Sequence, residues 1–319
     1  MTIEPQHIVC FGGGTGLPSL LSGIKHNPWL TITAIVNMFD NGGSSGELKD
    51  KFGILPPGDI LKCLLALSGD AEGARRILLK RIHNETFEGH TGGNMLLLAL
   101  ERVYGTHDNA IAALAQVLSA TGTVVPVTQS HSTLCALYTD GTTNRGEVGV
   151  DGGIIEGKDV RELYLDPPAK ASDRALAFIK TADVFCIGPG SFYTSVISNL
   201  LPEGIKTALQ ESSAPIIFVA NLLTEGKGME GYDLPRIVET VEGYIGRPVS
   251  SIIANTRLPD DEMLLRYQAE NKHPILSEGY GDPRLVTADL WLEETIARHD
   301  CARLAHLMYA VLYGRRECI

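Results

Sequence analysis

A loop rich in glycine, serine and aspartate, residues 40–59, carries the densest set of chemically capable side chains in the sequence. It follows an apolar, β-branched run and precedes a helical pattern, so it joins a predicted strand to a predicted helix. Loops of this length in a compact domain usually serve a site. Glycines admit a ligand close to the backbone and serine hydroxyls donate to phosphate oxygens, while the flanking Asp40 and Asp59 can hold a metal ion or a proton. The loop therefore predicts a phosphate site with an acidic edge.

Two more glycine turns join a strand to a helix, at residues 12–16 and 188–191. Thr15 is a candidate helix N-cap, and amides at a helix start bind anions. The first turn departs from the dinucleotide fingerprint G-x-G-x-x-G, since Leu17 stands where the third glycine would be. Carboxyl ends of parallel strands share one edge of a sheet, so we expect the three loops to converge on one crevice, with Asn221 beside it. Tight turns made only for strand–helix packing are the alternative.

A further glycine-opened helix starts after His90 and includes Asn94. Both a structural role and a ligand or proton contact are open for His90, because histidine titrates near neutral pH.

The order of the elements predicts an α/β fold with a mostly parallel sheet, since strands and helices alternate at both ends of the chain. Residues from about 60 to 120 read as a helical insertion after the second strand. Residues from about 124 to 166 read as a β-rich extension, with residues 146–157 as one of its strands. No linker divides the chain, so a single domain is expected over residues 1–319.

Composition narrows the classes of function. A formal net charge of −11 argues against extended contact with nucleic acid or anionic membranes. The sequence lacks an apolar run near the ~20 residues of a membrane span and lacks a signal peptide, so a cytoplasmic protein is expected. Six scattered cysteines match neither a disulfide framework nor a zinc site, so we expect buried free thiols.

Five motifs in this order resemble the 2-phospho-L-lactate transferase (CofD-like) family, and most closely its gluconeogenesis-factor (YvcK-like) branch. The resemblance covers nearly the whole chain. The motifs are GGGTGL, DNGGSSGELK followed by PPGDILKCLLALS, GHTGGN, GPGSFYTSVISNLL and NLLTEGKGMEGYD.

The resemblance implies a Rossmann-like three-layer α/β/α fold with one crevice for a nucleotide-type ligand. It implies a protein that binds a nucleotide sugar, UDP-N-acetylglucosamine, regulates carbon metabolism, cell-wall supply and cell shape, and forms a homodimer. The alternative is a Mg²⁺-dependent enzyme of the 2-phospho-L-lactate transferase type, acting on a nucleotide diphosphate donor. A nicotinamide oxidoreductase is a third and weaker hypothesis, because the second glycine and serine loop has no use in such a fold.

The same resemblance assigns roles to individual residues. For an enzyme, Asp40, Asp59 and His90 would be catalytic and Asp40 and Asp59 would bind Mg²⁺. The branch usually has two acids where this chain has Asp40 and Asn41, which weakens a two-carboxylate metal site and favours binding over catalysis. The expected ligand contacts are Gly12, Gly13, Gly14, Thr15, Gly16, Asp40, Asn41, Gly43, Ser44, Ser45, Asp59, Asn94, Gly188, Gly190, Ser191 and Asn221.

Overall fold

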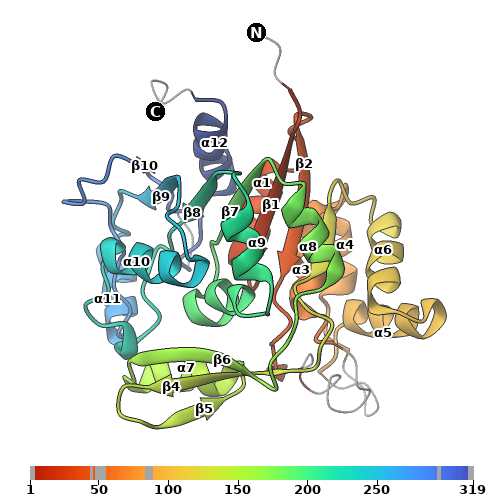
Figure 1. Ribbon diagram of the computed structural model, residues 1–319, viewed down its shortest axis with the longest axis horizontal. Coiled ribbons are helices and arrows are strands. Elements are labelled where there is room, and N and C mark those ends of the chain that lie inside the picture. The colour runs from red at the N-terminus through yellow and green to blue at the C-terminus, as the bar shows by residue number, and fades with distance from the viewer. Residues whose placement is uncertain (1–3, 44–45, 47–54, 83–88, 293–295, 315–319) are drawn as a thin grey trace.

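A parallel sheet forms the centre of the protein, which is described here as a computed structural model covering residues 4–43, 46, 55–82, 89–292 and 296–314 (Figure 1). Within these ranges its seven strands follow the order β10-β9-β8-β7-β1-β2-β3, and every neighbouring pair is parallel. The strands are β1 (Gln6–Gly12), β2 (Leu30–Val36), β3 (Thr123–Pro126), β7 (Val184–Ile187), β8 (Ile216–Val219), β9 (Ser251–Asn255) and β10 (Leu285–Ala288).

Helices cover both faces of this sheet, which confirms the predicted three-layer Rossmann-like α/β/α fold (Figure 1). From the β1–β7 pair the chain proceeds outward in opposite directions, so right-handed crossovers place the following helices on opposite faces. One layer contains α1 (Gly16–Ile24), α3 (Gly58–Leu67) and α12 (Cys301–Leu312), and the other contains α8 (Asp173–Lys180), α9 (Ile205–Glu211) and α10 (Leu234–Ile245).

The predicted helical insertion is confirmed between β2 and β3. After α3 it contains α4 (Ala71–Leu78), α5 (Gly92–Tyr104) and α6 (His107–Val117). Thr91 caps α5, because its side chain accepts a hydrogen bond from the amide of Asn94 at 3.2 Å. The insertion lies on the β2 side of the sheet, at the right in Figure 1, and α6 contacts β3.

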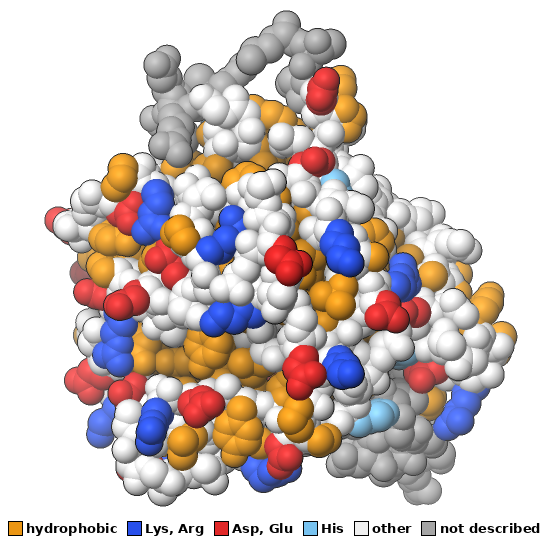
Figure 2. Space-filling model, in the orientation of Figure 1, with side chains coloured by type: hydrophobic (Ala, Val, Ile, Leu, Met, Phe, Trp, Pro, Cys, Tyr) orange, Lys and Arg blue, Asp and Glu red, His pale blue; other side chains and the backbone are white. Residues whose placement is uncertain are grey.

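The β-rich extension is a small antiparallel sheet of its own, drawn below the carboxyl ends of the central strands in Figure 1. In the described chain its order is β5-β4-β6, from β4 (Thr133–Tyr138), β5 (Thr143–Arg145) and β6 (Val160–Asp166). On the face shown in Figure 2, basic and acidic side chains are interspersed, and a hollow with a hydrophobic floor separates the main body from this sheet. The amide of Leu163 in β6 donates to the Tyr244 hydroxyl of α10 at 3.3 Å, which joins the two parts.

The strand predicted for residues 146–157 is wrong, because this segment forms the helix α7 (Glu147–Glu156). Its alternation of valine and glycine resembles a strand, but packing against β4 decides its conformation. The Tyr138 hydroxyl donates to the Val150 carbonyl at 3.2 Å, and a Cβ on Gly153 would lie 2.1 Å from that hydroxyl oxygen. Close contact of α7 with Tyr138 therefore requires glycine there, and tertiary packing overrides the local pattern.

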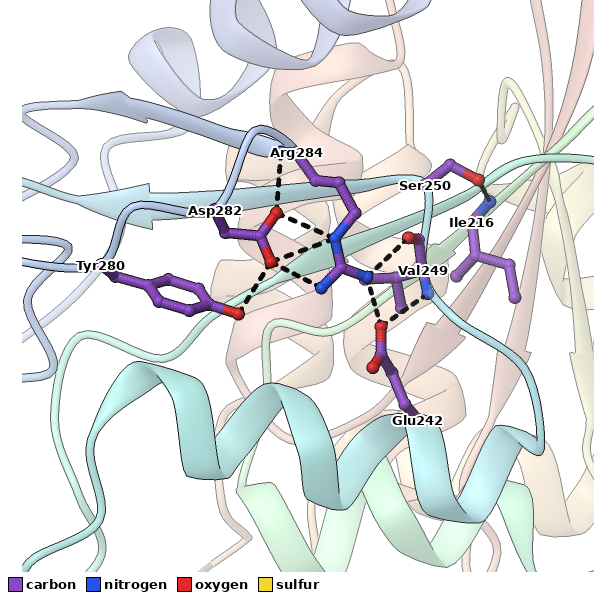
Figure 3. A network of polar contacts seen from close by, with 7 residues as sticks. All are labelled: Ile216, Glu242, Val249, Ser250, Tyr280, Asp282 and Arg284. Atoms are coloured by element: carbon purple, nitrogen blue, oxygen red, sulfur yellow. Dashed lines mark hydrogen bonds and ion pairs between the residues drawn. The ribbon is translucent and has the colours of Figure 1, made fainter.

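An ion-pair network fixes the β10 edge of the sheet (Figure 3). Arg284 donates to both carboxylate oxygens of Asp282 and, through Nη1, to Glu242 of α10 at 2.5 Å and the Val249 carbonyl at 3.0 Å. These hydrogen bonds lower the pKa of Asp282 well below its ordinary value. The bidentate pair with Asp282 fixes the Arg284 side chain, and its single charge-assisted hydrogen bond to Glu242 joins the start of the edge strand to α10. The remaining described elements are η1 (Phe192–Val196), η2 (Ile197–Leu200), η3 (Lys227–Met229) and α11 (Asp261–Ala269).

The core is mostly aliphatic, as the composition suggests. The thiols of Cys10, Cys63, Cys135 and Cys186 are free and buried, which confirms the expectation for these four. Across the described ranges, none of the helices combines the length and the apolar character that crossing a membrane requires.

Gly16 provides a test of the loop packing. A Cβ at this position would lie 2.6 Å from backbone atoms of Pro189 and Gly190, whereas a Cβ on Gly152 in α7 would meet nothing within 4 Å. We expect Gly16→Ala to lower the free energy of unfolding by about 1–3 kcal/mol through overpacking. Gly152→Ala should be neutral or stabilise by about 0.5–1 kcal/mol, because alanine is the better helix former. Urea unfolding of both variants checks this, and equal stabilities would show that the two loops are not in tight contact.

Candidate functional site

The glycine turns after β1 and β7 meet at the carboxyl edge of the central sheet, where the strand order reverses. The approach of Gly16 to Pro189 and Gly190 brings the two turns into backbone contact. Ligands of doubly wound α/β folds bind in the crevice at such a switch point. The predicted convergence of these loops is therefore present in the structure.

Asp59 fastens the first glycine turn to α3. Its carboxyl is only 4% exposed; Oδ2 accepts from the Gly14 amide at 2.7 Å, and Oδ1 accepts from Lys62 Nζ at 2.8 Å. Gly14 has a φ of +61°, and a Cβ on Gly13 would lie 2.5 Å from Asp59 Oδ2. The contact thus requires glycine at Gly13 and favours it at Gly14. Asp59 belongs to the crevice, with both oxygens already bonded within the protein.

Asp40 and Asn41 shape the second loop and join it to the extension. Asp40 Oδ1 accepts from the Gly42 amide at 2.7 Å, and Asn41 Oδ1 accepts from the Val148 amide at 3.1 Å. Val148 lies in the first turn of α7, so Asn41 satisfies an amide that has no partner within the helix. Gly43 is exposed with a φ of +44°. The predicted contacts Ser44 and Ser45 lie outside the described residues.

Glu147, which the sequence did not single out, lies at the start of α7, close enough to Asp40 and Asp59 for their charges to affect it. Its Oε2 is buried without a hydrogen-bond partner in the described part of the chain. Burial raises the pKa of Glu147 to about 9, and the negative charges of Asp40 and Asp59 add to the shift. At neutral pH the side chain is therefore protonated.

A second carboxylate that the sequence did not single out, Glu225, lies at the third loop. Its Oε1 accepts from the Phe192 amide at 2.7 Å, and its Oε2 accepts from the Ser191 hydroxyl at 3.2 Å. Asn221 Oδ1 accepts from the Gly190 amide at 3.5 Å. Burial raises the pKa of Glu225 to about 7. Its position after β8, at the same edge as Asn221, was the available sequence signal.

One cavity of about 350 Å³ opens beside these loops, and we call it the polar cavity. Predicted contacts that line it are Thr15, Gly16, Gly190, Ser191 and Asn221. Its other polar side chains include those of Thr224, Glu225, Tyr267, Lys272 and His299. Burial lowers the pKa of His299 to about 4, so its ring is neutral at physiological pH.

A neighbouring cavity of about 460 Å³, the basic cavity, also reaches Thr15. Lys62, Arg75 and Arg298 line it, with hydroxyls from Ser19 and Ser22. These cations come from α3, α4 and the segment before α12. Because they are far apart in the sequence, no local motif predicts the basic cavity. Both cavities are lined by Thr15, the N-cap of α1, whose side chain makes no capping bond.

Four other predicted site residues are buried in the structure. Gly12 ends β1, and its carbonyl accepts from Asn199 Nδ2 at 2.8 Å, while Gly188 has a φ of +78° and a buried backbone. His90 and Asn94 are 5% and 4% exposed at the start of α5, and neither lines the polar or the basic cavity. Their ligand contacts remain predictions.

The described residues offer few donors for the predicted Mg²⁺ ion. Among the described residues, no three His, Cys, Asp or Glu side chains are grouped to hold a metal ion. Lys62 already places a positive charge 2.8 Å from Asp59 Oδ1, and position 41 offers an amide. Mg²⁺ is commonly bound by one or two carboxylates together with waters and substrate phosphates, so its binding by Asp40 and Asp59 stays a prediction.

Glu147 gives a pH dependence that can be measured. The raised pKa means that the folded protein binds one more proton than the unfolded chain between pH of about 4.5 and 9. Its contribution to stability is therefore full below this window and is lost as the pH rises through it. We expect Glu147→Gln to gain at least about 1 kcal/mol of unfolding free energy relative to wild type between pH 5.5 and 8.5. Glu156→Gln, at the exposed end of α7, is the control for urea unfolding. If the unfolding free energies of Glu147→Gln and wild type changed in parallel with pH, Glu147 would be ionised in the folded protein.

Comparison with known proteins places this geometry in a family. The model of "2-phospho-L-lactate transferase CofD" matches residues 8–285. A putative gluconeogenesis factor of Thermotoga maritima is 35% identical over 309 residues, covering 94% of this chain and 98% of that protein. A gluconeogenesis factor of Halalkalibacterium halodurans is 31% identical, with 98% of each chain covered.

A crystal structure agrees with the sequence comparisons. It is that of a UPF0052 family member from Bacillus halodurans, which superposes with a TM-score of 0.87 at 31% identity and covers 95% of this chain and 98% of its own. The chain therefore belongs to the CofD family, and within that family it stands with the gluconeogenesis factors.

Proposed function

We propose that this protein binds a nucleotide sugar of the UDP-N-acetylglucosamine type and acts as a regulator. The observation that carries the proposal is that Thr15 lines both the basic and the polar cavity, so that the two lie side by side. A nucleotide sugar combines a doubly charged diphosphate with an uncharged, hydroxyl-rich sugar. A cavity lined by cations suits the diphosphate, and the adjoining cavity, lined mostly by uncharged polar groups, suits the sugar.

The diphosphate fits where the cavities meet. Lys62, Arg75 and Arg298 supply positive charge on one side, and α1 begins at the junction with the positive end of its dipole. The uncapped Thr15 hydroxyl adds a donor at the same point. Lys62 is paired with Asp59, but the described lining of the basic cavity also holds two arginines and no acidic side chain, which in a protein of net charge −11 is a local exception that favours an anion.

The regulatory part of the proposal rests on the relatives. Membership of the family supports a regulatory or a transferase-like function, and the relatives from Thermotoga maritima and Halalkalibacterium halodurans are named as gluconeogenesis factors. Control of carbon metabolism, cell-wall supply and cell shape, together with a homodimeric, cytoplasmic protein, completes the proposal.

A transferase of the 2-phospho-L-lactate type is the second candidate, favoured by the description of the matching family model. The donor set around Asp40 and Asp59 gives it less support, because both Asp59 oxygens already have partners.

Isothermal titration with UDP-N-acetylglucosamine, UDP and GDP, each with and without Mg²⁺, distinguishes the two functions. We expect UDP-N-acetylglucosamine to bind at micromolar concentration, about −8 kcal/mol, without Mg²⁺ and more tightly than GDP. Mg²⁺-dependent binding that prefers GDP would place the transferase first.

The basic cavity has a matched pair of arginines for a second test. Arg75 and Arg76 are consecutive and exposed on α4, but only Arg75 lines the cavity. We expect Arg75→Gln to weaken UDP-N-acetylglucosamine binding about three- to tenfold by removing one partly solvated, charge-assisted hydrogen bond to phosphate. Arg76→Gln, with the same change in net charge, should remain within about twofold of wild type. Equal losses in both variants would indicate a general charge effect and no phosphate at Arg75.

A further inference from the structure

Glu225 is a charged side chain in the wall of the polar cavity that lacks an assigned role. Three donors hold its carboxylate: the Phe192 amide at 2.7 Å, the Ser191 hydroxyl at 3.2 Å and Asn221 Nδ2 at 3.4 Å. They come from the turn after β7 and the segment after β8, the two sides of the crevice. The carboxylate is therefore fixed in position within the cavity wall.

This arrangement disfavours a phosphate at the third loop when Glu225 is ionised. The amide at the start of η1 is the donor that an anion would use at such a turn, and Glu225 already occupies it. The Gly190 amide donates to Asn221 Oδ1. A phosphate here would have to displace an internal carboxylate or lie beside a like charge, whereas the basic cavity offers three cations. The charge distribution thus orients the ligand, with phosphates at the basic cavity and sugar at the polar cavity.

The carboxylate retains room for a ligand. An ionised glutamate has about four lone-pair positions, and the three donors leave about one of them open. It can accept a hydrogen bond from a sugar hydroxyl and has nothing to donate to an acceptor. Thr224 and Asn221 supply uncharged polar groups in the same wall.

We propose that Glu225 determines which sugar the protein accepts: it binds a hydroxyl of an uncharged sugar and excludes a sugar that carries a carboxylate. The inference rests on the proposed nucleotide-sugar binding and deepens it. A side chain that served only as the cap of η1 would stabilise the fold equally for every ligand, so selectivity between sugars separates the two roles.

Other charged groups around Glu225 set the conditions of a test. The negative charge of Asp151 raises the pKa of Glu225, and the positive charge of Lys272 lowers it; His299, in the same cavity, is neutral because burial lowers its pKa to about 4. Between pH 6 and 8, Glu225 therefore changes its charge while His299 does not. Asp151 also has a raised pKa, so the glutamine variant at position 225 is needed to separate the two acids.

The experiment compares UDP-glucose with UDP-glucuronate, which differ only in a hydroxymethyl or a carboxylate at C6. Affinities are measured by titration calorimetry at pH 8.0 for the wild type, Glu225→Gln and Glu230→Gln. Glu230 is exposed in the same loop and gives the same change in net charge. We expect the wild type and Glu230→Gln to prefer UDP-glucose at least tenfold. Glu225→Gln should reduce this preference at least threefold, because glutamine keeps the shape without the charge.

The outcomes separate the inference from the function on which it rests. An unchanged preference in a Glu225→Gln variant that binds UDP-glucose like the wild type would overturn the sugar-selecting role and leave nucleotide-sugar binding intact. Failure of the wild type to bind UDP-N-acetylglucosamine as well as both of these UDP-sugars would overturn the proposed function together with the inference, whereas binding of UDP-N-acetylglucosamine without a preference for UDP-glucose would overturn the inference alone. If the variant does not fold, the wild type still decides: its preference should fall between pH 8.0 and 6.0, and a constant preference contradicts the role of Glu225.

Discussion

The structure depends on one close backbone contact, in which the turn after β1 lies directly against the turn after β7. Gly16 leaves no space for a side chain beside Pro189 and Gly190, and Asp59 holds the adjoining Gly14 amide from α3. Because the chain leaves β1 and β7 in opposite directions, this contact closes the floor of the crevice at the switch point. Both cavities reach the N-terminus of α1, where Thr15 lines each of them.

The turns that form the crevice are predictable from the sequence because strand-end glycines have a local cause. A turn of positive φ or a close approach requires glycine, so the turns can be located in the sequence from Gly14, Gly16 and Gly188. The alternation of strands and helices likewise predicts the parallel sheet. The strand predicted at α7 is wrong because the glycine at position 153 is required by its contact with Tyr138. That residue is distant in sequence, so a local pattern cannot show the contact.

The charged part of the site is less predictable, because it is assembled from segments far apart in the chain. Lys62, Arg75 and Arg298 each resemble an ordinary solvated cation in sequence, and only the packing of α1, α3, α4 and α12 brings them to one cavity. Glu147 and Glu225 were missed for a related reason. Their shifted pKa values arise from burial and from neighbours on other elements.

In this fold, internal carboxylates accept hydrogen bonds from glycine-turn amides that would otherwise be free to bind a phosphate. Glycine-rich turns at helix starts suggest phosphate sites because their amides are free to donate. Here Asp59 accepts from Gly14 and Glu225 accepts from Phe192, so the chain itself supplies an anion at both turns. Each carboxylate satisfies a donor that would otherwise be costly to bury, and each repels a second anion at the same point. Selectivity in the crevice then depends less on the glycine motifs than on where fixed negative and positive side chains face the ligand.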